Sequence, residues 1–159
     1  MKKIFGSVAI GLTLVASLLV GLAFVATSHQ AAYAAGEDGT RDVLTPTTVL
    51  NTGITQTLTA ASGDGHKFAN TGNDFIVATN DYTATVTLTV VTGGTVGGIA
   101  IEDVDVTVGA GGTRLIGPFN KSIFDQPSGT DAGKIYLNWD AAVTGTVASS
   151  VTIGVYRTE

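Results

Sequence analysis

The sequence predicts an all-β protein, an antiparallel β-sandwich or jelly-roll-like domain that follows an N-terminal hydrophobic helix. Polar and apolar residues alternate in several short segments, and Gly, Asn and Asp clusters separate these segments at intervals of about 8–12 residues. Beyond residue 34, no stretch of about eleven or more residues shows the apolar spacing of an amphipathic helix. Thr and Val, which favour the pleated geometry of a sheet, dominate the alternating segments.

The predicted strands follow from which residues share a face. Alternation is clearest in residues 83–90, where four Thr side chains occupy one face and four apolar side chains the other. Such two-sided strands are typical of antiparallel sheets with one face in water. Similar alternation occurs in 103–108, 150–156 and, more weakly, 54–59, whereas 75–78 and 134–139 are predicted as central strands. The Gly-rich segment 93–98 is predicted as a flexible hairpin or a β-bulge.

The first 34 residues contain the three parts of a secretory signal peptide. Lys2 and Lys3 supply positive charge, residues 4–27 are uncharged, and small residues flank Tyr33. We therefore predict cleavage after Ala34 and a secreted, extracellular or cell-surface location. The uncharged stretch is also long enough to span a bilayer, so a retained hydrophobic helix is the alternative. In either case the membrane is contacted only through this segment.

The rest of the chain is predicted to form one domain. Residues 35–53 are assigned to a flexible leader and candidate donor strand, and residues 54–159 to the β-sandwich. The sequence has no Cys, which excludes disulfide bonds and a cysteine nucleophile, so stability must come from core burial or from assembly. A net charge of −5 argues against a nucleic-acid partner, because nucleic-acid binding needs a basic surface.

Candidate chemical sites are sparse, and no catalytic residue or cofactor is predicted. His66 lies in a turn-rich segment, where a surface turn position is expected. Asp103 and Asp105 share the outward face of a predicted strand, which favours a solvated strand edge over a catalytic carboxylate pair. Neither a hydrolase triad motif nor a phosphate-binding loop is found. The protein is therefore predicted not to be an enzyme.

Calcium is the ion that the sequence favours if the protein binds one. Several Asp residues fall in predicted loops with Asn or Gly neighbours, and Ca²⁺ prefers carboxylate and amide oxygens. No EF-hand loop is present, so no metal ligand is assigned. The Asp residues in predicted loops are Asp64, Asp74, Asp81, Asp125 and Asp131.

Four aromatic residues are the candidates for an interface between subunits. Phe119 and Phe124 are expected to cap one end of the sandwich. Tyr136 and Trp139 lie on one predicted strand, and their odd spacing puts them on opposite faces. At most one of these two can face the core, and the other is available for a subunit contact or for stacking on a sugar.

The order of motifs between Gly63 and Arg157 resembles a known family. Residues 68–72 form an F-x-N-x-G motif, an alternating strand follows, and Ala110-Gly111 leads to Gly117-Pro118-Phe119. This order resembles the small all-β virion proteins of tailed bacteriophages, of the head-decoration kind. The resemblance implies a compact β-sandwich that works within an array, and it implies no catalytic residue. The export signal departs from that family and favours a cell-encoded, exported relative.

These observations lead to one expected function and several alternatives. We expect an exported structural subunit that self-assembles into an extracellular array, fibre or sheath through β-strand contacts. The partner is then another copy of the chain, and residues 43–58 are the predicted donor strand. The alternatives are a surface adhesin or carbohydrate-binding module that recognises glycans, a pilin-like subunit with a retained helix, and a virion decoration protein.

Overall fold

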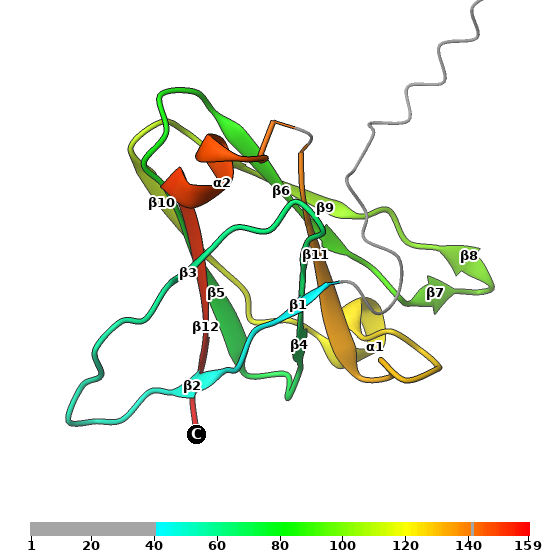
Figure 1. The fold of residues 1–159 in the computed structure, drawn as a ribbon. Helices are drawn as coiled ribbons and strands as arrows, with labels where there is room; N and C mark the ends of the chain where they lie inside the picture. Colours follow the sequence, from blue (N-terminus) through cyan, green and yellow to red (C-terminus); the bar gives the residue numbers. More distant parts are fainter. Residues whose placement is uncertain (1–40, 141) are drawn as a thin grey trace, which may run out of the picture. The chain divides into compact units, whose positions relative to one another are not determined.

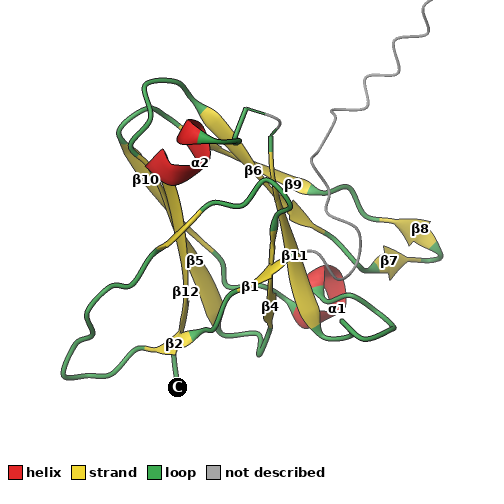
Figure 2. Ribbon diagram, viewed as in Figure 1, coloured by secondary structure: helices red, strands yellow, loops and turns green. Residues whose placement is uncertain are grey.

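The structure, a computed structural model, describes residues 41–140 and 142–159, and the fold below refers to these residues. They form twelve strands and two short helices (Figures 1 and 2), which confirms the all-β class. The predicted signal peptide and the start of the predicted leader lie outside the described residues. Within the described ranges, no helix is long and apolar enough to cross a membrane.

The first sheet has the strand order β1-β4-β11-β6-β9. Its strands are β1 (Asp42–Val43), β4 (His66–Ala69), β11 (Lys134–Trp139), β6 (Val86–Val91) and β9 (Val104–Val108). All neighbouring strands run antiparallel except β1, which is parallel to β4. Among the described strands, β1 and β9 are therefore the two edges of this sheet.

The second sheet has the order β10-β5-β12-β2, with β3 also paired to β12. Its strands are β10 (Gly112–Ile116), β5 (Asp74–Asn80), β12 (Val151–Arg157), β2 (Thr47–Thr48) and β3 (Thr59–Ala60). Strand β2 runs parallel to β12, and the other pairs are antiparallel.

The sheets are thus mixed, and the prediction of purely antiparallel sheets is wrong for β1 and β2. Both are two-residue strands within one short segment, which joins β4 of the first sheet and then β12 of the second. The segment was predicted to donate a strand to another copy, and the structure pairs it with β4 and β12 of its own chain.

The remaining elements are a hairpin and two helices. Strands β7 (Thr95–Val96) and β8 (Ile99–Ala100) pair with each other between β6 and β9 in the chain, and Figure 1 shows this hairpin extending away from both sheets. Gly97 and Gly98 have φ of 61° and 82°, as a two-residue type I′ turn requires. The helices are α1 (Lys121–Phe124) and α2 (Thr146–Ser150).

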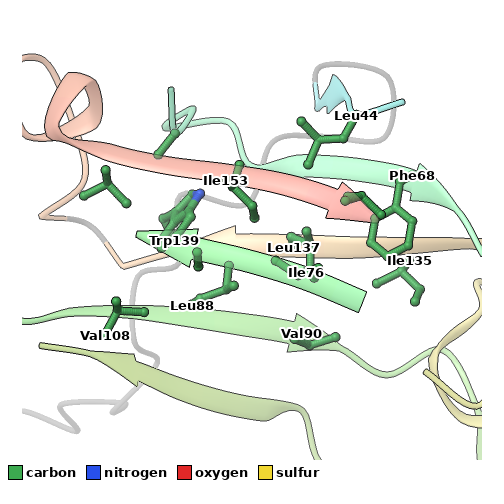
Figure 3. Packing of buried hydrophobic residues seen from close by; sticks show 14 of the residues in the cluster. Leu44, Phe68, Ile76, Leu88, Val90, Val108, Ile135, Leu137, Trp139 and Ile153 are labelled. Carbon is green, nitrogen blue, oxygen red and sulfur yellow. The ribbon is translucent and has the colours of Figure 1, made fainter. Parts of the chain in front are cut away.

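One hydrophobic core receives side chains from both sheets. Leu88 and Leu137 of the first sheet lie in the same cluster as Ile76 and Ile153 of the second, as Figure 3 shows. Along β5, buried residues alternate with half-buried ones, so the strand has one face in the core. Trp139 is the largest of the fully buried side chains. A shared core between two sheets is consistent with the predicted β-sandwich.

Candidate functional site

Three of the Asp residues that the sequence offers as calcium ligands, Asp74, Asp125 and Asp131, take part in separate structural contacts. Asp74 accepts hydrogen bonds from Arg157 Nε at 2.7 Å and from Thr71 Oγ1 at 2.8 Å. Asp125 accepts from Asn70 Nδ2 at 2.6 Å. Over 41–140 and 142–159, no three His, Asp or Glu side chains gather closely enough to hold a metal ion.

His66 is not the surface turn residue that the sequence suggested. It begins β4, and its side chain is fully buried. Its Nε2 accepts a hydrogen bond from the Ser62 N–H at 3.0 Å, which requires a neutral ring. Burial lowers the pKa of His66 to about 4, while the negative charge of Asp42 opposes this shift. His66 therefore contributes to the core and not to a titrating surface.

A buried ionic cluster surrounds Asp131. Lys67 Nζ lies 2.7 Å from one carboxylate oxygen, and Tyr136 donates its hydroxyl to the same oxygen at 2.8 Å. Lys134 pairs with the other oxygen, and the Arg41 guanidinium lies over the Tyr136 ring at 4.2 Å from its centre. Lys67 and Lys134 lie on adjacent strands, so the cluster links β4 to β11. We assign it a structural role.

The four predicted interface aromatics occupy different environments. Phe119 and Trp139 are buried in the core, and Phe124 and Tyr136 are half-buried. Phe119 packs edge-on against Phe124, with ring centres 5.4 Å apart. Trp139 has no exposed surface, so its ring offers no face on which a sugar could stack. A role for these aromatic residues between subunits stays a prediction.

The large apolar side chains that remain exposed lie mainly on strand edges and on the hairpin. Val43 is on the edge strand β1, Val104 on the edge strand β9, and Leu115 on β10. Leu115 is 70% exposed. Natural proteins usually protect free edges with Lys, Pro or bulges, because an unprotected edge pairs with another chain. The free edges are therefore the candidate functional site.

On the edge strand β9, one outward backbone group is occupied by a side chain. Thr87 of β6 donates its N–H to Asp140 Oδ2 at 2.7 Å and accepts from the Asp140 N–H at 3.0 Å. The backbone N–H and C=O groups of Thr87 therefore point away from β9. In an antiparallel pair the residue opposite behaves in the same way, so the N–H and C=O groups of Thr107 point away from β6. Arg114 Nε donates to the Thr107 carbonyl at 3.2 Å and occupies that outward acceptor.

Acidic residues also make this edge unfavourable for pairing with an identical strand. Asp105 lies within β9 and accepts a hydrogen bond from Thr89 Oγ1 at 2.6 Å, and Asp103 just before it accepts from the Thr92 N–H at 2.8 Å. Both carboxylates are on exposed residues. Two such strands placed side by side would oppose like charges, which is unfavourable.

Strand β10 presents a more open edge. Asp81, just after β5, donates its N–H to the Ser150 carbonyl at 2.8 Å. Because the backbone groups of alternate residues point to the same side of a strand, the N–H and C=O groups of the odd-numbered residues of β5 point toward β12. Thr113 and Leu115 lie opposite two of these residues, so their own N–H and C=O groups point away from β5. No described strand lies on that outer side. A weak contact of 3.5 Å joins Arg114 Nη1 to the Thr113 carbonyl.

Sequence reasoning missed this strand. The predicted strands do not include residues 112–116, which begin at the end of the Gly-rich segment 109–112. The available signal was the β-branched and aliphatic composition of 113–116 between a Gly-rich turn and Pro118, which fits a strand end.

Comparison of the chain with protein-family models, with curated proteins and with solved structures finds no match.

Proposed function

We propose that this protein is an exported, non-catalytic structural subunit that assembles with copies of itself into an extracellular array, fibre or sheath. The single observation that carries the proposal is the position of the exposed apolar side chains, which lie mainly on strand edges and on the hairpin. Contact through these edges would satisfy backbone groups and remove apolar surface from water at the same time. The β-sandwich supplies the rigid body that presents the edges.

The N-terminal segment offers one route for such contacts. Through β1 and β2, residues of the predicted donor segment pair with β4 and with β12 of their own chain. A neighbouring copy could supply the same two short strands, because exchange of an identical element replaces each contact by its equivalent. Leu44, between the two strands, is buried and would anchor the exchanged segment.

The experiment that tests the proposal is sedimentation velocity over a wide concentration range, combined with negative-stain electron microscopy. The full chain is expressed and the exported product is purified, with its mass showing whether cleavage follows Ala34. We expect species larger than a monomer that grow with concentration, and ordered polymers at the highest concentrations. A protein that sediments as one monomeric species at every concentration contradicts the proposal.

A deletion of residues 35–52 separates the two kinds of contact. Loss of assembly in this variant, with the circular dichroism of a β-protein retained, supports strand donation by the N-terminal segment. An unchanged distribution of oligomers removes the donor strand from the proposal and leaves the other edges to carry it.

A further inference from the structure

We propose that β10 pairs antiparallel with β10 of a second copy, around a two-fold axis that passes between the two Leu115 residues. The pairing joins the second sheets of the two copies into one continuous sheet. This inference rests on the proposed self-assembly and names the contact that begins it.

The partner follows from the chemistry of the edge. Thr113 and Leu115 each turn one backbone donor and one backbone acceptor outward, and an extended strand supplies the matching groups. The Thr113 carbonyl has only the weak 3.5 Å contact with Arg114 Nη1. The register of β10 against β5 is unbroken over Gly112–Ile116, and the strand contains neither Pro nor Lys. Apart from the charge of Arg114, this edge lacks the usual devices that prevent pairing.

Other described edges fit a second copy less well. On β9, the Thr107 carbonyl already accepts from Arg114, and Asp103 and Asp105 would face like charges on an identical strand. Strands β1 and β2 contain two residues each, which limits the number of backbone bonds that they can form. The edge of β10 is therefore the best match for an identical strand.

The position of the axis follows from the side chains. An axis at Arg114 would place two guanidinium groups opposite each other, and like charges in that position are unfavourable. An axis at Thr113 would leave each Leu115 opposite Gly111 and still exposed. An axis at Leu115 places the two Leu115 side chains opposite each other and brings Thr113 opposite Gly117.

The surface beside Leu115 adds apolar area to this contact. Val77 lies directly opposite Leu115 in the sheet and is half-buried on the same face. A shallow hollow of about 270 Å³ opens next to it, with Phe75, Leu115 and Pro118 in its lining. A second copy that joins along β10 would place its own Leu115 side chain beside this face and remove part of the Leu115 surface from water.

The absence of native Cys allows a direct test by disulfide trapping in the full chain. In Leu115→Cys the two Cα atoms would be about 5.5 Å apart, within the range for a disulfide. In Thr113→Cys the two positions lie four residues apart along the paired strands, about 13 Å, which is too far. Ser128→Cys is the exposed control, in a loop outside the strands and the hairpin.

We expect mild oxidation to convert most of Leu115→Cys into a covalent dimer on non-reducing gels, at least tenfold faster than either other variant. Equal rates for the three variants would show random collision and overturn the pairing. A dimer formed by Thr113→Cys instead of Leu115→Cys would overturn the position of the axis.

A second comparison separates this inference from the proposed function. Leu115→Lys should shift the sedimenting species toward the monomer, while Ser128→Lys, at an exposed loop position outside every strand, should leave them as in the unmodified protein. Assembly that persists unchanged in Leu115→Lys refutes the β10 contact and leaves the proposed self-assembly in place. An unmodified protein that is monomeric throughout refutes both.

Discussion

Replacing His66 by Gln should make the stability of the domain less dependent on pH between about 4 and 6.5. The His66 side chain is fully buried, and its Nε2 accepts the Ser62 N–H at 3.0 Å. Protonation would place an N–H against an N–H and a charge in the core. Burial therefore lowers the pKa of His66 from 6.5 to about 4, against the opposing effect of Asp42.

The sign of the effect follows from proton binding in the two states. In the unfolded chain this His returns to its ordinary pKa near 6.5, so between pH 6.5 and 4 the unfolded state binds a proton that the folded state lacks. The free energy of unfolding falls as the pH falls through this window. The contribution of His66 is complete above the unfolded pKa, and about 3 kcal/mol is lost by pH 4.

Urea unfolding at pH 7, 6, 5 and 4, followed by circular dichroism, measures this effect in the wild type and in His66→Gln. Gln does not titrate, and its side-chain oxygen can accept the Ser62 N–H. We expect the variant to be less stable than the wild type at pH 7. The difference between their free energies of unfolding should shift by about 3 kcal/mol in favour of the variant as the pH falls to 4. Carboxylate titrations common to both proteins cancel in the difference. If the free energies of unfolding of the two proteins changed equally with pH, the reasoning from the burial of His66 would be refuted.

Three further substitutions, with Gly109→Ala as a control, test the packing and the buried ion pair by the same unfolding assay. Trp139→Ala should lower the free energy of unfolding by about 3–5 kcal/mol, because the indole ring is fully buried. Gly154→Ala should cost about 1–3 kcal/mol, since its Cβ would lie 2.7 Å from a loop carbonyl, whereas Gly109→Ala meets nothing within 4 Å and should be neutral. Asp131→Asn should cost about 3–5 kcal/mol by leaving the buried ammonium of Lys67 without its carboxylate partner.

The strands with regular alternation or continuous apolar runs could be predicted from the sequence. The run 134–139 matches β11 at both ends, and 150–156 differs from β12 by one residue at each end. In these strands the side chains that face the core are apolar, so the pattern that forms the strand is visible locally.

Strand β4 could not be predicted in this way. Its first two residues, His66 and Lys67, are polar but buried. The groups that make this burial tolerable are Ser62 and Asp131, and Asp131 is 64 residues away from Lys67 in the sequence. Periodicity within a short window contains no information about such a partner, which explains why His66 was expected at the surface.

The weak alternation of residues 54–59 illustrates the opposite error. Only Thr59–Ala60 forms a strand there, and the preceding residues follow β12 through a different contact, in which the Tyr156 hydroxyl donates to the Thr57 carbonyl at 3.0 Å. Leu58 lies close to Gly154, where the absence of a Cβ gives the loop room. Close approach of a loop to a strand was not visible in the alternation of either segment.

The candidate site was predictable only in part, because an edge is a property of the whole sheet. The acidic character of 103–105 was visible in the sequence, and the structure places these residues at an edge. Which strands are edges depends on pairings between distant segments, such as β6 with β11 and β5 with β12. The role of Arg114, which occupies a carbonyl of β9 from its position on β10, depends on the same long-range arrangement.

The symmetry of the proposed β10 contact limits what that contact can build. A two-fold contact uses the same surface on both copies, so it is complete after two copies and cannot by itself extend into an array. Growth beyond the dimer requires a second contact elsewhere on the subunit. The β7–β8 hairpin carries Val96 and Ile99, which are 70% and 75% exposed, and it projects away from both sheets (Figure 1). The exposed hairpin is therefore the surface that we propose for this second contact.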